Sequence, residues 1–362
     1  MPLLWDISRQ IRVELSLPAL RSENKLAQTV GRGFPDAVLE DFISVLHRPD
    51  MHYESIIGYL ETNHLRNARS PDPDQPYLGL AAWLTEVIYD KIYNIHVQKS
   101  RNPDATVEYL DGLKKLTSKN LPLWVFSLNH DVVLESAAAR LGLAVNSGFP
   151  GSASLPLPSP FAGETSIKVE VVTEEEMSHG LRFLQSGNEG INLIKLHGGI
   201  DIFTLRDGKD VLKLLPVGDH ASAMIHALFL ANKVLPYRSP NNVNVINTIM
   251  YTDVFGEVQF LNRSILSGVF KYNKRMHQVL PVNFLAVFQT MLNQVSKLLC
   301  CGYGFGDTHI NNVLRQWLEY SADRNIEIID PKRCKEVPPD FLHLAPQIAL
   351  RPMKVGAYLR GM

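Results

Sequence analysis

The chain has 362 residues, 45% of them hydrophobic, which is enough apolar material for one large domain or two smaller ones. Its 36 Lys and Arg against 37 Asp and Glu leave a formal net charge of −1, and this balance argues against a general nucleic-acid coat protein. No stretch approaches the roughly 18 consecutive apolar residues of a membrane span. Three cysteines, two of them adjacent, supply neither a disulfide framework nor the paired C-x-x-C knuckles of a structural zinc site. We therefore expect a reduced, cytoplasmic protein with no metal site, no membrane contact and no direct nucleic-acid binding.

The N-terminal third is predicted to be helical. Apolar residues recur at helical spacing over 3–17, 36–66 and 78–97. The Pro-rich segment 70–76 separates the last two stretches, since proline is excluded from a helix interior. The apolar faces of these helices are expected to pack against other parts of the protein.

Residues 30–118 are expected to form a helical insertion or subdomain. This segment contains many large apolar side chains, among them Trp83, Tyr89 and Tyr93. We expect them to supply much of a self-association interface, so that the protein is a homo-oligomer. Core packing within the subunit is the alternative.

Four short apolar runs predict buried strands of a parallel sheet. They cover 123–126, 192–196, 298–301 and 326–329, and each ends in a polar or Gly-rich turn. This arrangement is typical of an α/β protein with an open, Rossmann-like parallel sheet. In such sheets ligands bind beyond the carboxyl ends of the strands.

The segments between these strands are predicted to contain two helices and longer loops. Helices are expected over 132–141, with Asp131 as the N-cap, and from Thr308 to about Tyr320. The Gly-, Pro- and Ser-rich segment 146–165 is predicted to be a loop or mobile lid. Residues 205–290 have a mixed sequence pattern that predicts no single type of element. Within them, the stretch from Asn241 to Asn247 is predicted to be loop and turn.

Each strand end supplies a different kind of side chain to the expected ligand-binding edge. Asn129 and Asp131 follow the first strand, and His197 follows the second, before two glycines that let a ligand approach. The third strand leads into a Gly-x-Gly-x-Gly turn at a helix N-terminus, which suits a phosphate or a ribose oxygen. The fourth ends at Asp330, a candidate partner for a ribose hydroxyl. The candidate nucleotide-binding residues of the last two turns are Gly302, Gly304, Gly306, Asp307 and Asp330.

Three segments resemble motifs of sirtuin-fold proteins. Ser127–Asp131 (S-L-N-H-D) resembles their T-x-N-x-D element, and Lys195–Gly199 (K-L-H-G-G) resembles their (K/E)-L-H-G element. Cys301–Ile310 (C-G-Y-G-F-G-D-T-H-I) is similar to the G-Y-S-F-G-D-x-H-I motif of the bacterial sirtuin-like branch linked to antiphage defence. The resemblance implies one sirtuin-like domain over 1–362, with large helical insertions and a core over 119–335 that carries the NAD-site motifs.

The resemblance also implies a reaction, the hydrolysis of NAD+ to ADP-ribose and nicotinamide. Asn129 would hold the reactive ribose or the attacking water, and Asp131 would help to place the nicotinamide amide. His197 would act as a general base, a role that suits an imidazole because its pKa lies near working pH. NAD is then the substrate, and the chain would act as the effector of a bacterial antiphage system by depleting NAD+.

The sequence departs from the family pattern at several places. The zinc-binding C-x-x-C pairs of protein-deacylating sirtuins are missing, which makes deacylase activity the weakest alternative. Gly304 stands where the family has Ser, and His130 where it has Tyr. The family's opening G-A-G-x-S loop is not found, so we expect either a start roughly 20–40 residues upstream or a chain without its phosphate cradle.

These departures leave a second hypothesis open, a catalytically silent NAD-binding or scaffolding subunit of a defence complex. The chain shows no second enzymatic domain. Relatives in this branch act with partner subunits, so the resemblance implies a partner in trans, such as a HerA-type ATPase/translocase or a short Argonaute.

Overall fold

The computed structural model describes most of the chain. The described residues are 4–31, 33–67, 76–99, 108–118, 120–156, 166–205, 209–215, 236–238, 244–252, 258–265, 283–332 and 335–362.

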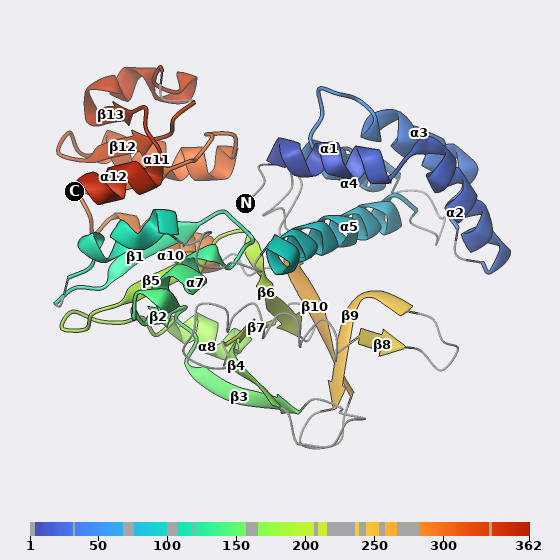
Figure 1. Ribbon diagram of the computed structural model, residues 1–362, viewed down its shortest axis with the longest axis horizontal. Coiled ribbons are helices and arrows are strands. Elements are labelled where there is room, and N and C mark those ends of the chain that lie inside the picture. Colours follow the sequence, from blue (N-terminus) through green and yellow to red (C-terminus); the bar gives the residue numbers. More distant parts are fainter. Residues whose placement is uncertain are drawn as a thin grey trace.

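The N-terminal part is helical, as predicted. Its helices are α1 (Leu4–Glu14), α2 (Leu17–Thr29), α3 (Asp36–Leu46), α4 (Tyr53–Asn67) and α5 (Pro76–Lys99). They gather on one side of the molecule in Figure 1. The expected Pro-rich break lies outside the described residues up to position 75, and Pro76 opens α5, where its missing N–H costs no helical hydrogen bond. Among the described helices, none combines enough length with enough apolar character to cross a membrane.

The large aromatic side chains of α5 pack inside the chain. Tyr89 is 1% exposed, and its hydroxyl donates to the carbonyl of Ile200 at 2.9 Å. Trp83 lies edge-on to the ring of Phe42, and Tyr93 is partly buried against the same core. These three side chains therefore contribute to folding within the subunit, and the expected self-association stays a prediction.

Two small parallel sheets contain the four predicted strands. One has the order β1-β5-β2, and the other has the order β11-β12-β13. Their bounds are β1 (Leu123–Ser127), β2 (Val145–Asn146), β5 (Ile191–Lys195), β11 (Lys297–Cys301), β12 (Asn325–Ile329) and β13 (Ile348–Arg351). The α/β class with parallel strands is confirmed. The expectation of one continuous open sheet is not, because no ladder joins β1 to β11 within the described part of the chain.

The two sheets differ from the prediction in how far their strands are buried. Every residue of β5 is buried, as expected for a central parallel strand. Every residue of β1 is only half-buried, since β5 pairs with one of its edges and no described strand with the other. Burial on both faces, predicted for all four strands, is therefore wrong for β1. It is also wrong for β11, where only Cys300 is buried and Lys297 and Cys301 are exposed.

A seven-stranded antiparallel sheet, which we did not predict, is the largest sheet among the described residues. Its order is β3-β4-β7-β6-β10-β9-β8. The strands are β3 (Gly151–Pro156), β4 (Ser166–Val172), β6 (Gly198–Leu205), β7 (Asp210–Leu214), β8 (Pro236–Arg238), β9 (Asn244–Thr252) and β10 (Val258–Ile265). Helix α5 passes over β6 and β10 in Figure 1, and residues of α5, β4, β6 and β7 share one hydrophobic core.

This sheet corrects two predicted loops. Residues 151–156 of the segment 146–165 form β3, and 157–165 lie outside the described residues. In the Asn-rich stretch, residues 244–247 belong to β9, and 241–243 lie outside the described part. The small and polar residues of β3 carry little strand preference of their own, but they pair along β4, and Asn244 of β9 pairs with Arg238 of β8.

The remaining helices flank the parallel sheets. They are the 3₁₀ segment η1 (Glu108–Leu116), α7 (Val133–Arg140), α8 (Glu174–His179), α10 (Asn283–Leu292), α11 (Thr308–Tyr320), the 3₁₀ segment η3 (Pro339–Gln347) and α12 (Val355–Gly361). Helices α7 and α11 confirm the two predicted helices. One core joins Ile194 of β5 to Ile328 of β12 and Trp317 of α11, so the two parallel sheets share their apolar interior.

Candidate active site

The turns after β1 and β5 are hydrogen-bonded to each other. The amide of Leu196 donates to the carbonyl of Ser127 at 2.9 Å, and the amide of Ile200 donates to the carbonyl of His130 at 2.9 Å. Gly198 has a φ of 72°, and a Cβ there would lie 1.9 Å from the carbonyl oxygen of Ser264. Only glycine fits this position, which fixes the chain immediately after His197.

A buried ion network lies directly behind these turns. The ammonium of Lys195 is 2.7 Å from an oxygen of Asp201, 2.8 Å from an oxygen of Glu135, and 2.7 Å from the carbonyl of Asp131. Burial alone would lower the pKa of Lys195, but the two carboxylates outweigh this effect and raise it above its ordinary value. A charged Lys195 therefore holds the Asp131 turn in place.

The prediction that Asp131 is the N-cap of α7 is wrong by one residue, since Asp131 lies immediately before the N-cap. The N-cap of α7 is Val132, and the Asp131 carboxylate accepts a hydrogen bond from the amide of Val133 at 3.0 Å. Asn129 precedes Asp131 in the same turn, and the backbone N–H of Asn129 donates to the Ser127 hydroxyl at 3.1 Å. Asn129 is exposed, so a ligand can reach it.

The loop between β11 and α11 is held in a strained shape. Gly302 has a φ of 67°, and Phe305 has a φ of 55°, a conformation that costs a residue with a side chain about 1–2 kcal/mol. The buried side chain of Asn311 donates to the Phe305 carbonyl at 2.9 Å and accepts from the Tyr303 hydroxyl at 2.8 Å. Such strain persists only where the surroundings over-determine the backbone, and it is common at functional sites.

Asp307 ends this loop at the N-cap position of α11. Aspartate is a common N-cap residue, but the Asp307 side chain makes no capping hydrogen bond to the helix. Its carboxylate instead lies 3.9 Å from Nε2 of His197. Burial, together with the charges of Glu54 and Asp307, raises the pKa of Tyr53.

His197, Asp307 and His309 meet at one point, here called the histidine corner. Nε2 of His197 is 3.1 Å from Nε2 of His309, and the ligand-type atoms of the three side chains all lie within 4.8 Å of one another. His197 is 2% exposed, while the other two are half-buried. The ring of His130 lies 6.5 Å from that of His197.

His309 is the residue that sequence reasoning did not assign to the site. It lies within the motif Cys301–Ile310, which by itself indicates no role for it. The spacing Asp-x-His at a predicted helix start was the available indication, because it puts both side chains on the first turn of the helix, next to the carboxyl end of β11.

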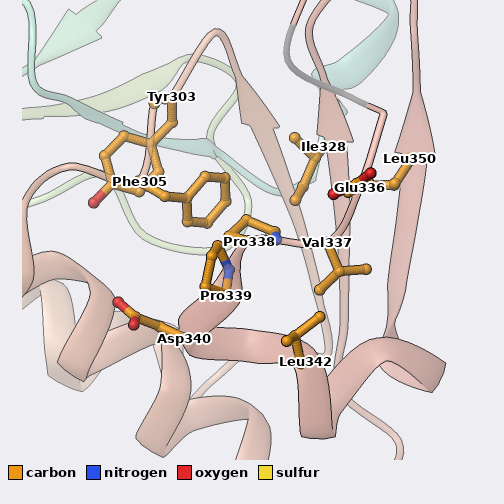
Figure 2. A pocket seen from close by; sticks show the side chains of 11 residues that line it. Tyr303, Phe305, Ile328, Glu336, Val337, Pro338, Pro339, Asp340, Leu342 and Leu350 are labelled. Carbon is orange, nitrogen blue, oxygen red and sulfur yellow. The ribbon is translucent and has the colours of Figure 1, made fainter.

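A pocket of 490 Å³ is lined in part by the same loop (Figure 2). Gly304 and the rings of Tyr303 and Phe305 form one wall, and Figure 2 shows Phe305 facing two prolines of η3 and its approach. Glu336 and Asp340 add carboxylates at its edges. The remaining lining residues are Ile328, Val337, Pro338, Pro339, Leu342 and Leu350.

The other predicted nucleotide-binding residues are spread along this edge. Gly306 faces open space where a Cβ would stand, as does Gly302. Asp330 follows β12, and its carboxylate accepts from the amide of Lys332 at 2.7 Å, a turn contact. The structure thus brings His197 and Asp307 together, puts Asn129 and Asp131 in the adjoining turn, and associates Gly304 with the pocket.

No protein-family model matches this sequence, and no curated protein matches it. The functional proposal below is therefore supported by the motifs and by the geometry of the strand ends.

Proposed function

We propose that this chain hydrolyses NAD+ to ADP-ribose and nicotinamide, and that it serves as the NAD+-depleting effector of a bacterial antiphage system with a sirtuin-type core over 119–335. The observation that carries the proposal is the position of His197. It is a buried imidazole at the carboxyl end of β5, hydrogen-bonded through its turn to the neighbouring turn that exposes Asn129. The three motifs that resemble sirtuin elements supply the choice of substrate.

The reaction requires a base, a positioned ribose and a leaving group. Water attacks C1′ of the nicotinamide ribose, the C1′–N bond breaks, and neutral nicotinamide departs with the bonding electron pair. Nε2 of His197 accepts the proton that the water loses, and the Asp307 carboxylate at 3.9 Å stabilises the resulting imidazolium. The exposed amide of Asn129 orients the ribose or the water, and Asp131 orients the nicotinamide amide.

The pocket beside Gly304 suits the far end of the dinucleotide. Its aromatic wall, Tyr303 and Phe305, offers faces on which an adenine ring stacks. Its carboxylates, Glu336 and Asp340, are acceptors for ribose hydroxyls. Gly302 and Gly306 leave the backbone of the loop open to phosphate oxygens, and Asp330 lies at the next strand end.

One observation favours the silent alternative, an NAD-binding or scaffolding subunit. Nε2 of His197 lies 3.1 Å from Nε2 of His309, so the nitrogen assigned as the base already has a polar neighbour. An active enzyme would have to release this contact when water and substrate enter. Protein deacylation has less support, because the sequence lacks the paired C-x-x-C zinc motifs of protein-deacylating sirtuins.

The proposed role in defence includes partners. We expect a homo-oligomer that acts with a subunit in trans, a HerA-type ATPase/translocase or a short Argonaute, and that binds no nucleic acid itself. The near-zero net charge supports the last point.

The test is NAD+ cleavage by the purified chain, with nicotinamide release measured by chromatography. Asn129→Ala and His197→Ala should each remove cleavage, the second by about 10²–10⁴-fold, the usual contribution of a general base. His343→Ala is the matched control, since His343 is an exposed histidine paired with Glu319 at 2.9 Å and lies on η3. Thermal melting checks that each variant folds.

The outcomes separate the two hypotheses. Nicotinamide release that survives His197→Ala at the wild-type rate would show that the assigned base is wrong. A wild-type chain that binds NAD+ in calorimetry, yet releases no nicotinamide alone or with a partner subunit, would support the silent alternative.

The pocket is tested separately by Gly304→Val. The added side chain would occupy the wall between the two aromatic rings, so we expect loss of NAD+ affinity with an unchanged melting temperature. A variant that melts early, or that binds NAD+ normally, would show that the glycine serves only the strand-to-helix turn.

A further inference from the structure

From the geometry of the histidine corner we infer that His197, Asp307 and His309 form a binding site for one divalent transition-metal ion. The inference does not depend on NAD+ hydrolysis, since it concerns only the three side chains and the space between them. It does compete with that proposal for one atom, because Nε2 of His197 cannot accept a proton while it binds an ion, and bound metal is therefore expected to suppress NAD+ cleavage. It also differs from the sequence expectation of no metal, which considered only cysteine pairs.

The distances agree with ligands around one ion. Metal–nitrogen bonds of about 2.0–2.1 Å place two ligand atoms roughly 2.9–3.4 Å apart at angles between square and tetrahedral. The two imidazole nitrogens are 3.1 Å apart, inside that range. The Asp307 oxygen is 3.9 Å from His197 Nε2, so a side-chain adjustment of about 0.5–1 Å completes the set.

The three ligands come from elements that are fixed independently. His197 follows β5, where Gly198 admits no side chain and the turn is bonded to that of β1. Asp307 and His309 stand at the start of α11, and Asn311 on the same helix anchors the preceding loop. Sites on rigid elements need little rearrangement on binding, which favours affinity.

The chemistry of the ligands selects the class of ion. Two imidazoles and one carboxylate suit first-row ions such as Zn²⁺, Co²⁺ or Ni²⁺ better than Mg²⁺ or Ca²⁺, which prefer oxygen. Three protein ligands leave coordination positions for water or another small ligand. The half-buried Asp307 and His309 provide the entry path, while the buried His197 closes the inner side.

A hydrogen bond between the two imidazoles is the competing explanation of the 3.1 Å contact. It requires one imidazole to donate to the other, and it predicts no affinity for metal above that of a surface histidine. A metal ion, by contrast, would need the facing nitrogen lone pairs of both rings. The two explanations therefore differ in a direct binding measurement.

The experiment measures Co²⁺ and Zn²⁺ binding to the purified full chain after treatment with a chelator. Calorimetry gives stoichiometry and affinity, and the visible spectrum of Co²⁺ reports its ligands. The test variants are His309→Gln and Asp307→Asn. His343→Gln is the matched control, because His343 and Glu319 form a histidine–carboxylate pair on the surface at 2.9 Å.

We expect one Co²⁺ per chain, a spectrum of nitrogen and oxygen ligands, and competition by Zn²⁺. Each test variant should weaken binding by at least about 10–100-fold, the loss that follows when even the outer shell of a metal site is altered. The control should bind as the wild type does.

Three results would overturn the inference. These are no saturable binding at one ion per chain, equal affinity in the wild type and in both test variants, or an intense thiolate band that shows cysteine as the ligand. If a test variant fails to fold, the stoichiometry and spectrum of the wild-type chain still decide. Failure here leaves the NAD+ cleavage assay unaffected. Cleavage by the metal-free chain that stops when the ion is added would show that both proposals hold, with the ion blocking Nε2 of His197.

Discussion

Replacing Lys195 by Met would remove the cation from the buried network behind the active-site turns. The Lys195 side chain is 2% exposed, and its partners Glu135 and Asp201 are 4% and 0% exposed. Lys213, at 3.7 Å from Glu135, partly compensates that carboxylate, but the ion pair of Asp201 is with Lys195. Breaking a buried ion pair from one side costs about 3–5 kcal/mol, because an uncompensated charge stays buried.

That loss is large beside a typical unfolding free energy of about 5–15 kcal/mol. Urea unfolding at neutral pH, followed by tryptophan fluorescence and by circular dichroism, should show it as a lower midpoint. Lys209→Met is the matched control, since Lys209 is exposed and 4.0 Å from Glu174, and its midpoint should not change. In Lys195→Met, unlike the control, Asn129 should also be held less firmly in its turn, because the Lys195 ammonium donates to the carbonyl of Asp131 in that turn at 2.7 Å.

A second substitution tests the physical reason. In the double variant Lys195→Met with Asp201→Asn, the uncompensated charge on Asp201 is gone, so the double variant should be more stable than the sum of the single losses predicts. A coupling of about 0.5–3 kcal/mol is expected for groups in direct contact. Strict additivity, or a Lys195→Met variant within 1 kcal/mol of wild type, would refute the reasoning.

Further predictions concern the loop after β11 and the sheet beside it. Gly302→Ala should destabilise the chain by about 1 kcal/mol, because Gly302 has a φ of 67°, while Gly306→Ala, with open space and no positive φ, should change the urea midpoint little. Burial opposes the ionisation of Glu327, but hydrogen bonds from Arg351 and Tyr358 lower its pKa below the ordinary value. Its contribution to stability is therefore present above about pH 4.3 and is lost as the pH falls through the lowered pKa. Glu327→Gln should flatten the acid side of the stability curve, and an unchanged curve would contradict this assignment.

Much of the local structure follows from the sequence by itself. Helix α11 spans the predicted residues from Thr308 to Tyr320, because one face repeats apolar residues at helical spacing. The strand β5 matches a short apolar run because all of its residues are buried, whereas β11 matches its run although Cys300 is its only buried residue. The candidate site residues Asn129 and His197 could be named because each directly follows such a run.

The tertiary structure alone decided which strands pair and which side chains meet. The residues of β3 have little strand preference of their own, whereas β9 is rich in Val, Ile, Thr and Tyr and has a composition typical of a strand. In both strands the pairing partners lie elsewhere in the chain. The separation of β1 and β11 into two sheets is likewise a matter of pairing between distant segments. His197 and His309 are 112 residues apart in sequence and 3.1 Å apart in space. Local patterns record which residues are buried, whereas contact between distant residues depends on how the buried faces pack, and that is settled only when the whole core assembles.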